Sequence, residues 1–292
     1  MKTSFVTFQS TDSIQLHGLL FQSEGFNKSI VIHIHGMAGN FYENSFIAEM
    51  AKSYTSNGIA FLTYNNRGHD YYCDLLHVDT GETCLGGAAY EIFEECVFDI
   101  EGAILFAKSL GYTEIVLQGH SSGANKAVYY LSKQKSGIHG VALLSPCDDI
   151  GLHIDDLGDN RVSELLNHAR ELISSGSPDQ FMPPKTFFDY LLSAKTYFDC
   201  FQPGSALDAF PYRDPQNAFV LFGSVQIPIF ISFGNNGDYL LQNPEDVAML
   251  LNLKKSINAS LSFNVIDGAS HSYTGKEKEL VTALVKWIKD LG

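Results

Sequence analysis

The sequence predicts an α/β fold in which a mostly parallel sheet of eight strands is flanked by helices, with a helical segment inserted after the sixth strand. Two observations lead to this prediction. Short apolar runs of strand length alternate with stretches of helical periodicity along most of the 292 residues. The alternation stops once, between about residues 149 and 224, where an insertion longer than an ordinary loop is found.

The first part of the chain supplies four predicted strands. Residues 4–9 and 14–22 alternate polar and apolar side chains, as the two strands of a hairpin do. Residues 29–34 and 58–64 are mostly apolar and suit the buried middle of a parallel sheet. A helix from about 42 to 56 connects these two buried strands.

A long irregular segment is predicted at residues 65–91, before a helix at 92–110. The segment contains histidine, acidic and cysteine side chains of the kinds that bind metal ions, but they show no recognised ligand spacing. The sequence therefore predicts no metal site and no cofactor.

A sharp turn is predicted between the apolar run 115–117 and a helix whose apolar residues begin at Ala124. The turn is Gly-His-Ser-Ser-Gly at 119–123, a strand-to-helix setting in which the glycines leave room for a strained backbone. Such a turn lifts a serine hydroxyl above the sheet, so Ser121 is the candidate nucleophile. The alternative interpretation is an ordinary glycine-rich turn.

The alternation of strands and helices resumes after the insertion. A strand is predicted at 140–144, directly before the insertion; after it come strands at 227–233 and 260–266 and helices at about 244–254 and 276–291. We expect residues 1–148 and 225–292 to form one core and residues 149–224 to form a helical lid. Aromatic side chains crowd this predicted lid; some should hold it together, and others should face a cleft beneath it.

Composition argues against several classes of partner. The chain has 19 basic and 33 acidic residues, and its formal charge of −14 repels phosphate backbones and anionic membrane surfaces. No run approaches the ~18 apolar residues of a membrane span. The five cysteines are widely spaced, without a C-x-x-C pair, which favours reduced thiols in the cytoplasm. A small molecule is the expected partner, and a homodimer is compatible with the sequence.

Together these elements resemble the α/β-hydrolase superfamily over nearly the whole chain apart from the insertion. The superfamily's order of nucleophile, acid and histidine is met by Ser121, Asp238 and His271, each of which follows the carboxyl end of a predicted strand. The resemblance implies a serine hydrolase in which His271 removes the proton of Ser121 and Asp238 holds the imidazole in the required tautomer.

The resemblance also assigns an oxyanion hole to the backbone N–H groups of Met37 and Ser122. From the residues alone, the loop 35–40 around Met37 fits a plain strand-to-helix turn equally well. Asp148 and Asp149 follow the sixth predicted strand, where some members of the superfamily carry the acid, and they remain alternatives to Asp238.

Among hydrolases, the chain is similar to lid-bearing carboxylesterases, including feruloyl and cinnamoyl esterases, with a fainter similarity to siderophore-type esterases. This similarity implies a small or medium ester with an aromatic or bulky apolar group. The sequence departs from the cinnamoyl pattern at Ser122, where a larger amide side chain is frequent, and in the long segment 65–91. Thioesterases, amidases, peptidases and acyltransferases stay open, as does a ligand receptor without turnover.

Overall fold

The computed structural model of the protein describes residues 1–133, 136–240 and 243–291. Its main sheet is made of β1 (Lys2–Gln9), β2 (Gln15–Gln22), β3 (Ser29–Ile34), β4 (Ala60–Tyr64), β7 (Glu114–His120), β8 (Gly140–Leu144), β9 (Ile229–Gly234) and β10 (Leu261–Ile266). These eight strands lie in the order β1-β2-β4-β3-β7-β8-β9-β10. β2 pairs antiparallel with β1 and β4, and all later neighbours pair in parallel, as predicted.

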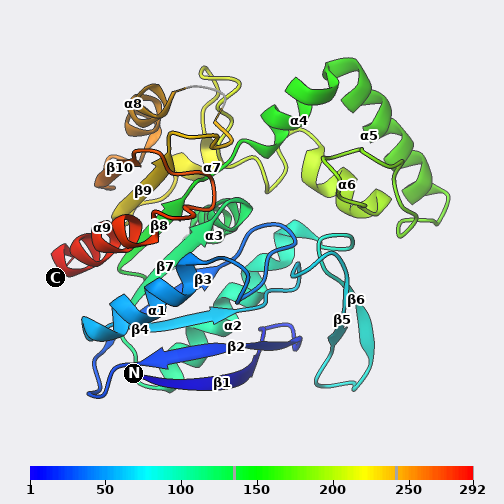
Figure 1. Cartoon of the computed structure of the whole chain (residues 1–292). Helices are drawn as coiled ribbons and strands as arrows, with labels where there is room; N and C mark the ends of the chain where they lie inside the picture. The colour runs from blue at the N-terminus through cyan, green and yellow to red at the C-terminus, as the bar shows by residue number, and fades with distance from the viewer. Residues whose placement is uncertain (134–135, 241–242, 292) are drawn as a thin grey trace.

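One face of the sheet is covered by α1 (Phe46–Ser56) and α9 (Glu277–Asp290), which pack against each other (Figure 1). Both helices bury apolar residues at helical spacing, such as Met50 and Tyr54 on α1 and Leu280 and Leu284 on α9. Every second residue of the strands points to this face, and side chains such as Val116 pack with the two helices in one hydrophobic cluster.

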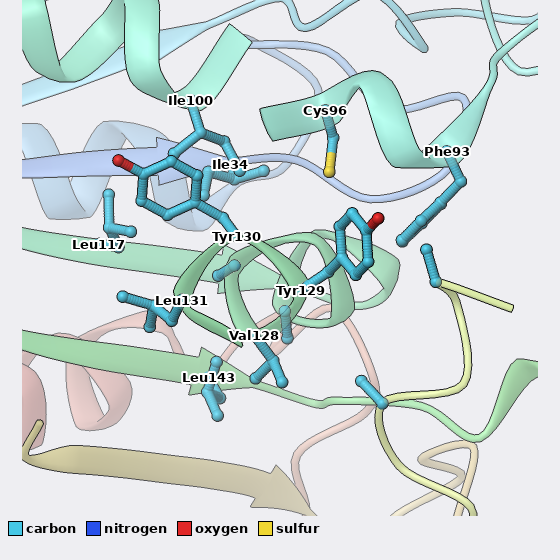
Figure 2. Packing of buried hydrophobic residues seen from close by; sticks show 14 of the residues in the cluster. Ile34, Phe93, Cys96, Ile100, Leu117, Val128, Tyr129, Tyr130, Leu131 and Leu143 are labelled. Atoms are coloured by element: carbon cyan, nitrogen blue, oxygen red, sulfur yellow. The ribbon is translucent and has the colours of Figure 1, made fainter. Parts of the chain in front are cut away.

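The opposite face is covered by α2 (Cys96–Ser109), α3 (Ser122–Ser132) and α8 (Pro244–Lys254). A short 3-10 helix, η1 (Phe93–Glu95), precedes α2, so the helix predicted at 92–110 is present with a tighter first turn. Figure 2 shows Val128, Tyr130 and Leu131 of α3 packed between Ile100 of α2 and the sheet residues Leu117 and Leu143. This buried contact fixes the second half of α3 against the strands and α2.

The prediction that residues 65–91 are irregular is wrong in part. β5 (Cys73–Leu76) and β6 (Thr83–Gly86) form a separate two-stranded antiparallel sheet within this segment. Both strands have only four residues, and β6 is exposed except at its last position, so no alternating apolar pattern marks them in the sequence.

The insertion between β8 and β9 contains α4 (Asp149–Leu157), α5 (Asp159–Ser174), α6 (Ala194–Phe201) and α7 (Val220–Gly223). Helical structure was expected throughout, but the stretches 175–193 and 202–219 are not helical. Prolines interrupt both stretches, because proline lacks an N–H and clashes within a helix: Pro178, Pro183, Pro184, Pro203, Pro211 and Pro215. Figure 1 places α4, α5 and α6 beyond the carboxyl ends of the central strands.

Within the described residues, no helix combines the length and the apolar character that crossing a bilayer requires.

Candidate active site

Ser121 occupies a strained turn between β7 and α3. Its backbone has φ 56° and ψ −134°, a conformation that residues other than glycine rarely adopt. A Cβ on Gly119 would lie 2.3 Å from the carbonyl oxygen of Gly123, and one on Gly123 would lie 2.2 Å from that of Ile34. The N–H of Ser121 donates to the carbonyl of Leu144 at 2.9 Å. Both glycines of the motif are therefore required by close backbone packing.

His271 and Asp238 lie in contact at the carboxyl ends of β10 and β9. His271 Nδ1 donates to Asp238 Oδ1 over 2.8 Å, and the Asp238 side chain is only 3% exposed. Asp238 also accepts hydrogen bonds from the Ser145 hydroxyl and from the N–H groups of Gly234 and Tyr239, at 2.8, 3.0 and 2.9 Å. Burial alone would raise the pKa of Asp238, but the bonds from His271, Ser145 and Gly234 outweigh it and hold the pKa below its usual value. Asp238 is therefore a carboxylate that fixes one tautomer of His271.

A cavity of about 440 Å³ opens between this pair and the turn, and both Ser121 and His271 line it. Among the described residues, the Ser121 hydroxyl has no hydrogen bond to His271; its polar neighbour is the Cys147 thiol, with Oγ and Sγ 3.9 Å apart. Cys147 is buried, and burial raises its pKa well above the usual value, so the thiol is neutral. The structure thus brings Ser121 and His271 to one cavity without a bond between them.

His120, the residue before Ser121, ties the His271 loop to the turn. Its Nε2–H donates to the backbone oxygen of His271 at 2.9 Å, and the two ring centroids are 4.9 Å apart. Burial, together with the proximity of His271, lowers the pKa of His120 to about 3, so its ring is neutral. The ring of His120 packs against Phe46 and does not compete for the Ser121 hydroxyl among the described contacts.

The loop after β3 approaches Ser121 closely. A Cβ on Gly36 would lie 2.9 Å from the Cβ of Ser121, so only glycine allows this approach. A turn closed by the Gly39 N–H and the Gly36 oxygen, 3.2 Å apart, contains Met37, which lines the cavity. Ser122 is the first residue of α3, where a backbone N–H has no acceptor within the helix.

A network of buried polar side chains holds the loop after β3 in place. Lys126 of α3 is fully buried and pairs with Glu91, with Nζ and Oε1 2.5 Å apart. Lys126 also donates to Asn66 Oδ1 at 3.3 Å, and the Asn66 N–H donates to His35 Nε2 at 3.0 Å. The network links α3 to the loops after β3 and β4.

The two alternative acids lie in different environments. Asp148 caps α4 and accepts from the N–H groups of Gly151 and Arg213 at 2.6 and 2.7 Å. Asp149 lines the cavity and is 9% exposed, and its Oδ2 has no hydrogen-bond partner. Burial, and then the neighbouring Asp148, raise the pKa of Asp149 to about 7. Neither carboxylate bonds to His271 among the described residues.

Aromatic side chains of the insertion divide as expected between core and cleft. Phe187, Phe188 and Tyr190 line the cavity, whereas others, such as Phe210 and Phe222, are buried in the main core. The sequence interpretation missed several further residues that line the cavity: Glu43, Tyr71, Cys147, Asp189 and Tyr239. Only Tyr239 carried a signal, its position directly after the candidate acid.

Comparison with solved structures gives similarity over the whole chain. An α/β hydrolase from Penicillium sp., GrgF, has a TM-score of 0.70 at 14% identity, with 99% of each chain covered. A siderophore hydrolase, EstB from Aspergillus fumigatus, has a TM-score of 0.69 at 14% identity, covering 99% of this chain and 98% of that one. Est1E from Butyrivibrio proteoclasticus, in a structure with bound ferulic acid, has a TM-score of 0.65 at 16% identity, covering 98% and 99%. The protein has the α/β-hydrolase fold.

A search of curated proteins gave no significant match to this chain. A family model described as a protein of unknown function, DUF1749, matches residues 92–290, which include the turn at Ser121, the insertion and the Asp238–His271 pair. Because this match covers more than half of the sequence, the chain belongs to the DUF1749 family.

Proposed function

We propose that the protein is a serine hydrolase that cleaves carboxylic esters through an acyl-enzyme intermediate. In this proposal Ser121 is the nucleophile, His271 the general base and Asp238 its carboxylate partner. The observation that carries the proposal is the 2.8 Å bond between His271 and Asp238 at a cavity that the strained Ser121 also lines. The fold shared with the siderophore hydrolase EstB, and with Est1E in its structure with bound ferulic acid, adds support.

Acylation begins when the Ser121 hydroxyl attacks the carbonyl carbon of the ester. Because Asp238 occupies Nδ1 of His271, Nε2 is left as the acceptor for the serine proton. The resulting imidazolium is stabilised by the Asp238 carboxylate. The intermediate collapses when His271 returns the proton to the leaving alcohol, which leaves the acyl group on Ser121.

Deacylation repeats these steps with water. His271 removes a proton from the water, the hydroxide attacks the acyl carbon, and the proton then returns to Ser121 as the acid departs. In both tetrahedral intermediates the oxyanion accepts hydrogen bonds from the N–H groups of Met37 and Ser122. Removal of one such donor typically costs about 3 kcal/mol of transition-state stabilisation.

Residues 149–224 act as a lid over the core formed by residues 1–148 and 225–292. The support for this assignment is that the insertion supplies one wall of the cavity, including Phe187, Phe188 and Tyr190. An ester with an aromatic or bulky apolar group matches these rings.

The position of the Ser121 hydroxyl favours a second candidate, a ligand receptor without turnover. The hydroxyl lies beside the Cys147 thiol and forms no bond to His271 among the described residues. In a hydrolase, however, the hydrogen bond between nucleophile and base is frequently long before substrate binds. The reactivity of the Ser121 hydroxyl therefore decides between the two candidates.

A panel of 4-nitrophenyl esters that differ in acyl length and aromaticity tests the hydrolase proposal. Wild-type protein should hydrolyse them with saturation kinetics, and Ser121→Ala should reduce the rate to background while its thermal unfolding is unchanged. Equal turnover by both proteins would remove Ser121 from the reaction. Failure of the wild type with every ester, together with measurable binding of one, would favour the receptor.

A further inference from the structure

The cavity contains a buried carboxylate that the proposed reaction does not use. Asp149 lies at the start of α4 and lines the cavity beside Cys147, yet its Oδ2 has no hydrogen-bond partner. A buried carboxylate oxygen without a partner is unfavourable, because burial removes its hydration and nothing replaces it. A donor on a bound molecule would supply the missing bond.

The remaining charges of the cavity have the same sign. Glu43 and Asp189 stand at its exposed rim, while no lysine or arginine lines it among the residues that the structure describes. The pKa of the Tyr190 hydroxyl is raised to about 12, first by burial and then by the nearby Tyr71, Asp149 and Glu43. The effect of both carboxylates shows that they lie near this ring. The cavity is therefore a site of negative potential that would repel an anionic substrate.

Aromatic rings extend from the catalytic histidine around the cavity. Tyr239 contacts His271 with ring centroids 4.8 Å apart, and Phe188 lies 6.0 Å from Tyr239. Phe187 and Tyr190 continue the series, with centroids 6.2 Å apart. The faces of aromatic rings attract cations, more strongly at a buried ring such as Phe187 than at exposed ones such as Phe188 and Tyr239. A carboxylate next to aromatic rings is therefore suited to an organic cation.

We propose that the substrate carries a protonated amine or guanidinium group, which donates to Asp149 and lies against the aromatic rings of the cavity. That the bound cation belongs to a substrate rests on the proposed ester hydrolysis. The binding of a cation at Asp149 does not depend on it. A neutral hydroxyl would also satisfy Asp149 Oδ2, but it would gain nothing from the excess of carboxylates. Charge is thus the property that separates the proposed substrates from neutral esters of the same shape.

The binding test compares benzylammonium with benzyl alcohol, which have similar shape and differ in charge, by isothermal titration at a pH above the pKa of Asp149. Wild-type protein should bind benzylammonium at least about tenfold more tightly, the effect of a hydrogen bond to a charged group. Asp149→Asn should remove this preference. Asp290→Asn, which removes one exposed carboxylate at the end of α9, should retain it and so controls for net charge.

Equal affinity of the wild type for the two ligands, or no binding of benzylammonium, would overturn the inference even if Asp149→Asn did not fold. A preference for the amine that persists in a folded Asp149→Asn variant would also overturn it.

A second arm measures kcat/KM with the 4-nitrophenyl esters of 4-(aminomethyl)benzoate and 4-ethylbenzoate. The amine ester should be preferred by the wild type and not by Asp149→Asn. If neither ester is cleaved while benzylammonium still binds through Asp149, the cation site stands and the proposed hydrolysis fails. Preference for the ethyl ester would contradict the assigned substrate class.

Discussion

His271 Nδ1 and Asp238 Oδ1 lie 2.8 Å apart although 33 positions separate them in the sequence. The contact forms because β9 and β10 are parallel neighbours, so the loops that follow them leave the same edge of the sheet. Three further donors hold Asp238 in place. The orientation of the imidazole is thus built into the strand ends and does not depend on a bound substrate.

Asp238→Asn should lower kcat by about 10⁴ with a smaller effect on KM, because an amide at this position supports the wrong histidine tautomer. The measurement is ester hydrolysis by purified variants with matched thermal unfolding. Asp149→Asn, assayed with a neutral ester that does not use the proposed cation site, is the comparison, since Asp149 has no bond to His271 among the described residues. A large loss of kcat with Asp149→Asn and a small one with Asp238→Asn would reassign the acid.

His120→Ala should lower kcat by roughly tenfold or more, because loss of the bond to the His271 backbone lets the imidazole move relative to Ser121. His120→Gln keeps an N–H donor and should recover part of the loss. Steady-state kinetics of both variants give the result. Equal effects of the two substitutions would show that the hydrogen bond is not what positions His271.

Asp149→Asn should stabilise the protein in alkaline but not in acidic solution. The pKa of Asp149 in the folded state, about 7, lies above its usual value of 3.8. The contribution of Asp149 to the free energy of unfolding is therefore fully present below pH 3.8 and is lost as pH rises through the folded-state pKa. Each unit of raised pKa corresponds to about 1.4 kcal/mol. Asp148, which contributes to the shift, and His271, which opposes it, remain in the variant.

The measurement is thermal unfolding of wild type and Asp149→Asn from below the usual pKa of 3.8 to above the folded-state pKa of about 7. The difference in Tm should grow in favour of the variant as pH increases. A difference that is independent of pH would mean that Asp149 titrates normally.

Gly123→Ala should destabilise the fold by about 3 kcal/mol or more, because its Cβ would lie 2.2 Å from the Ile34 carbonyl oxygen and the backbone must move. Gly25→Ala is the matched control, since nothing lies within 4 Å of a Cβ there, and its effect should stay within about 0.5 kcal/mol. Urea unfolding followed by circular dichroism measures both. Similar stability of the two variants would contradict the packing described for the turn.

Much of this architecture could be predicted from the sequence because it depends on local patterns. The apolar runs that became β3 and β8 have the predicted bounds, and the fold class is confirmed by the sheet and by its likeness to a solved α/β hydrolase. The order of Ser121, Asp238 and His271 relative to the strands predicts that all three side chains meet. The structure bonds the last two to each other, and among the described residues Ser121 has no bond to His271. Their catalytic roles remain proposals.

Other features could not be predicted, because they arise only when distant segments pack. The short strands β5 and β6 have no apolar alternation, and their pairing depends on a hairpin that the sequence does not mark. The thiol of Cys147 beside Ser121 and the unpartnered oxygen of Asp149 likewise depend on how the chain leaves β8. The sequence leaves Asp149 as an alternative acid for His271; in the structure it lies in the cavity wall without a bond to His271 among the described residues.

The most direct test of the account is labelling with a fluorophosphonate probe, followed by mass spectrometry of the digested protein. Wild-type protein should acquire one adduct, on Ser121, and neither Ser121→Ala nor His271→Ala should be labelled although both remain folded. An unlabelled wild type, or an adduct that persists elsewhere in Ser121→Ala at the wild-type rate, would contradict an activated serine at this position.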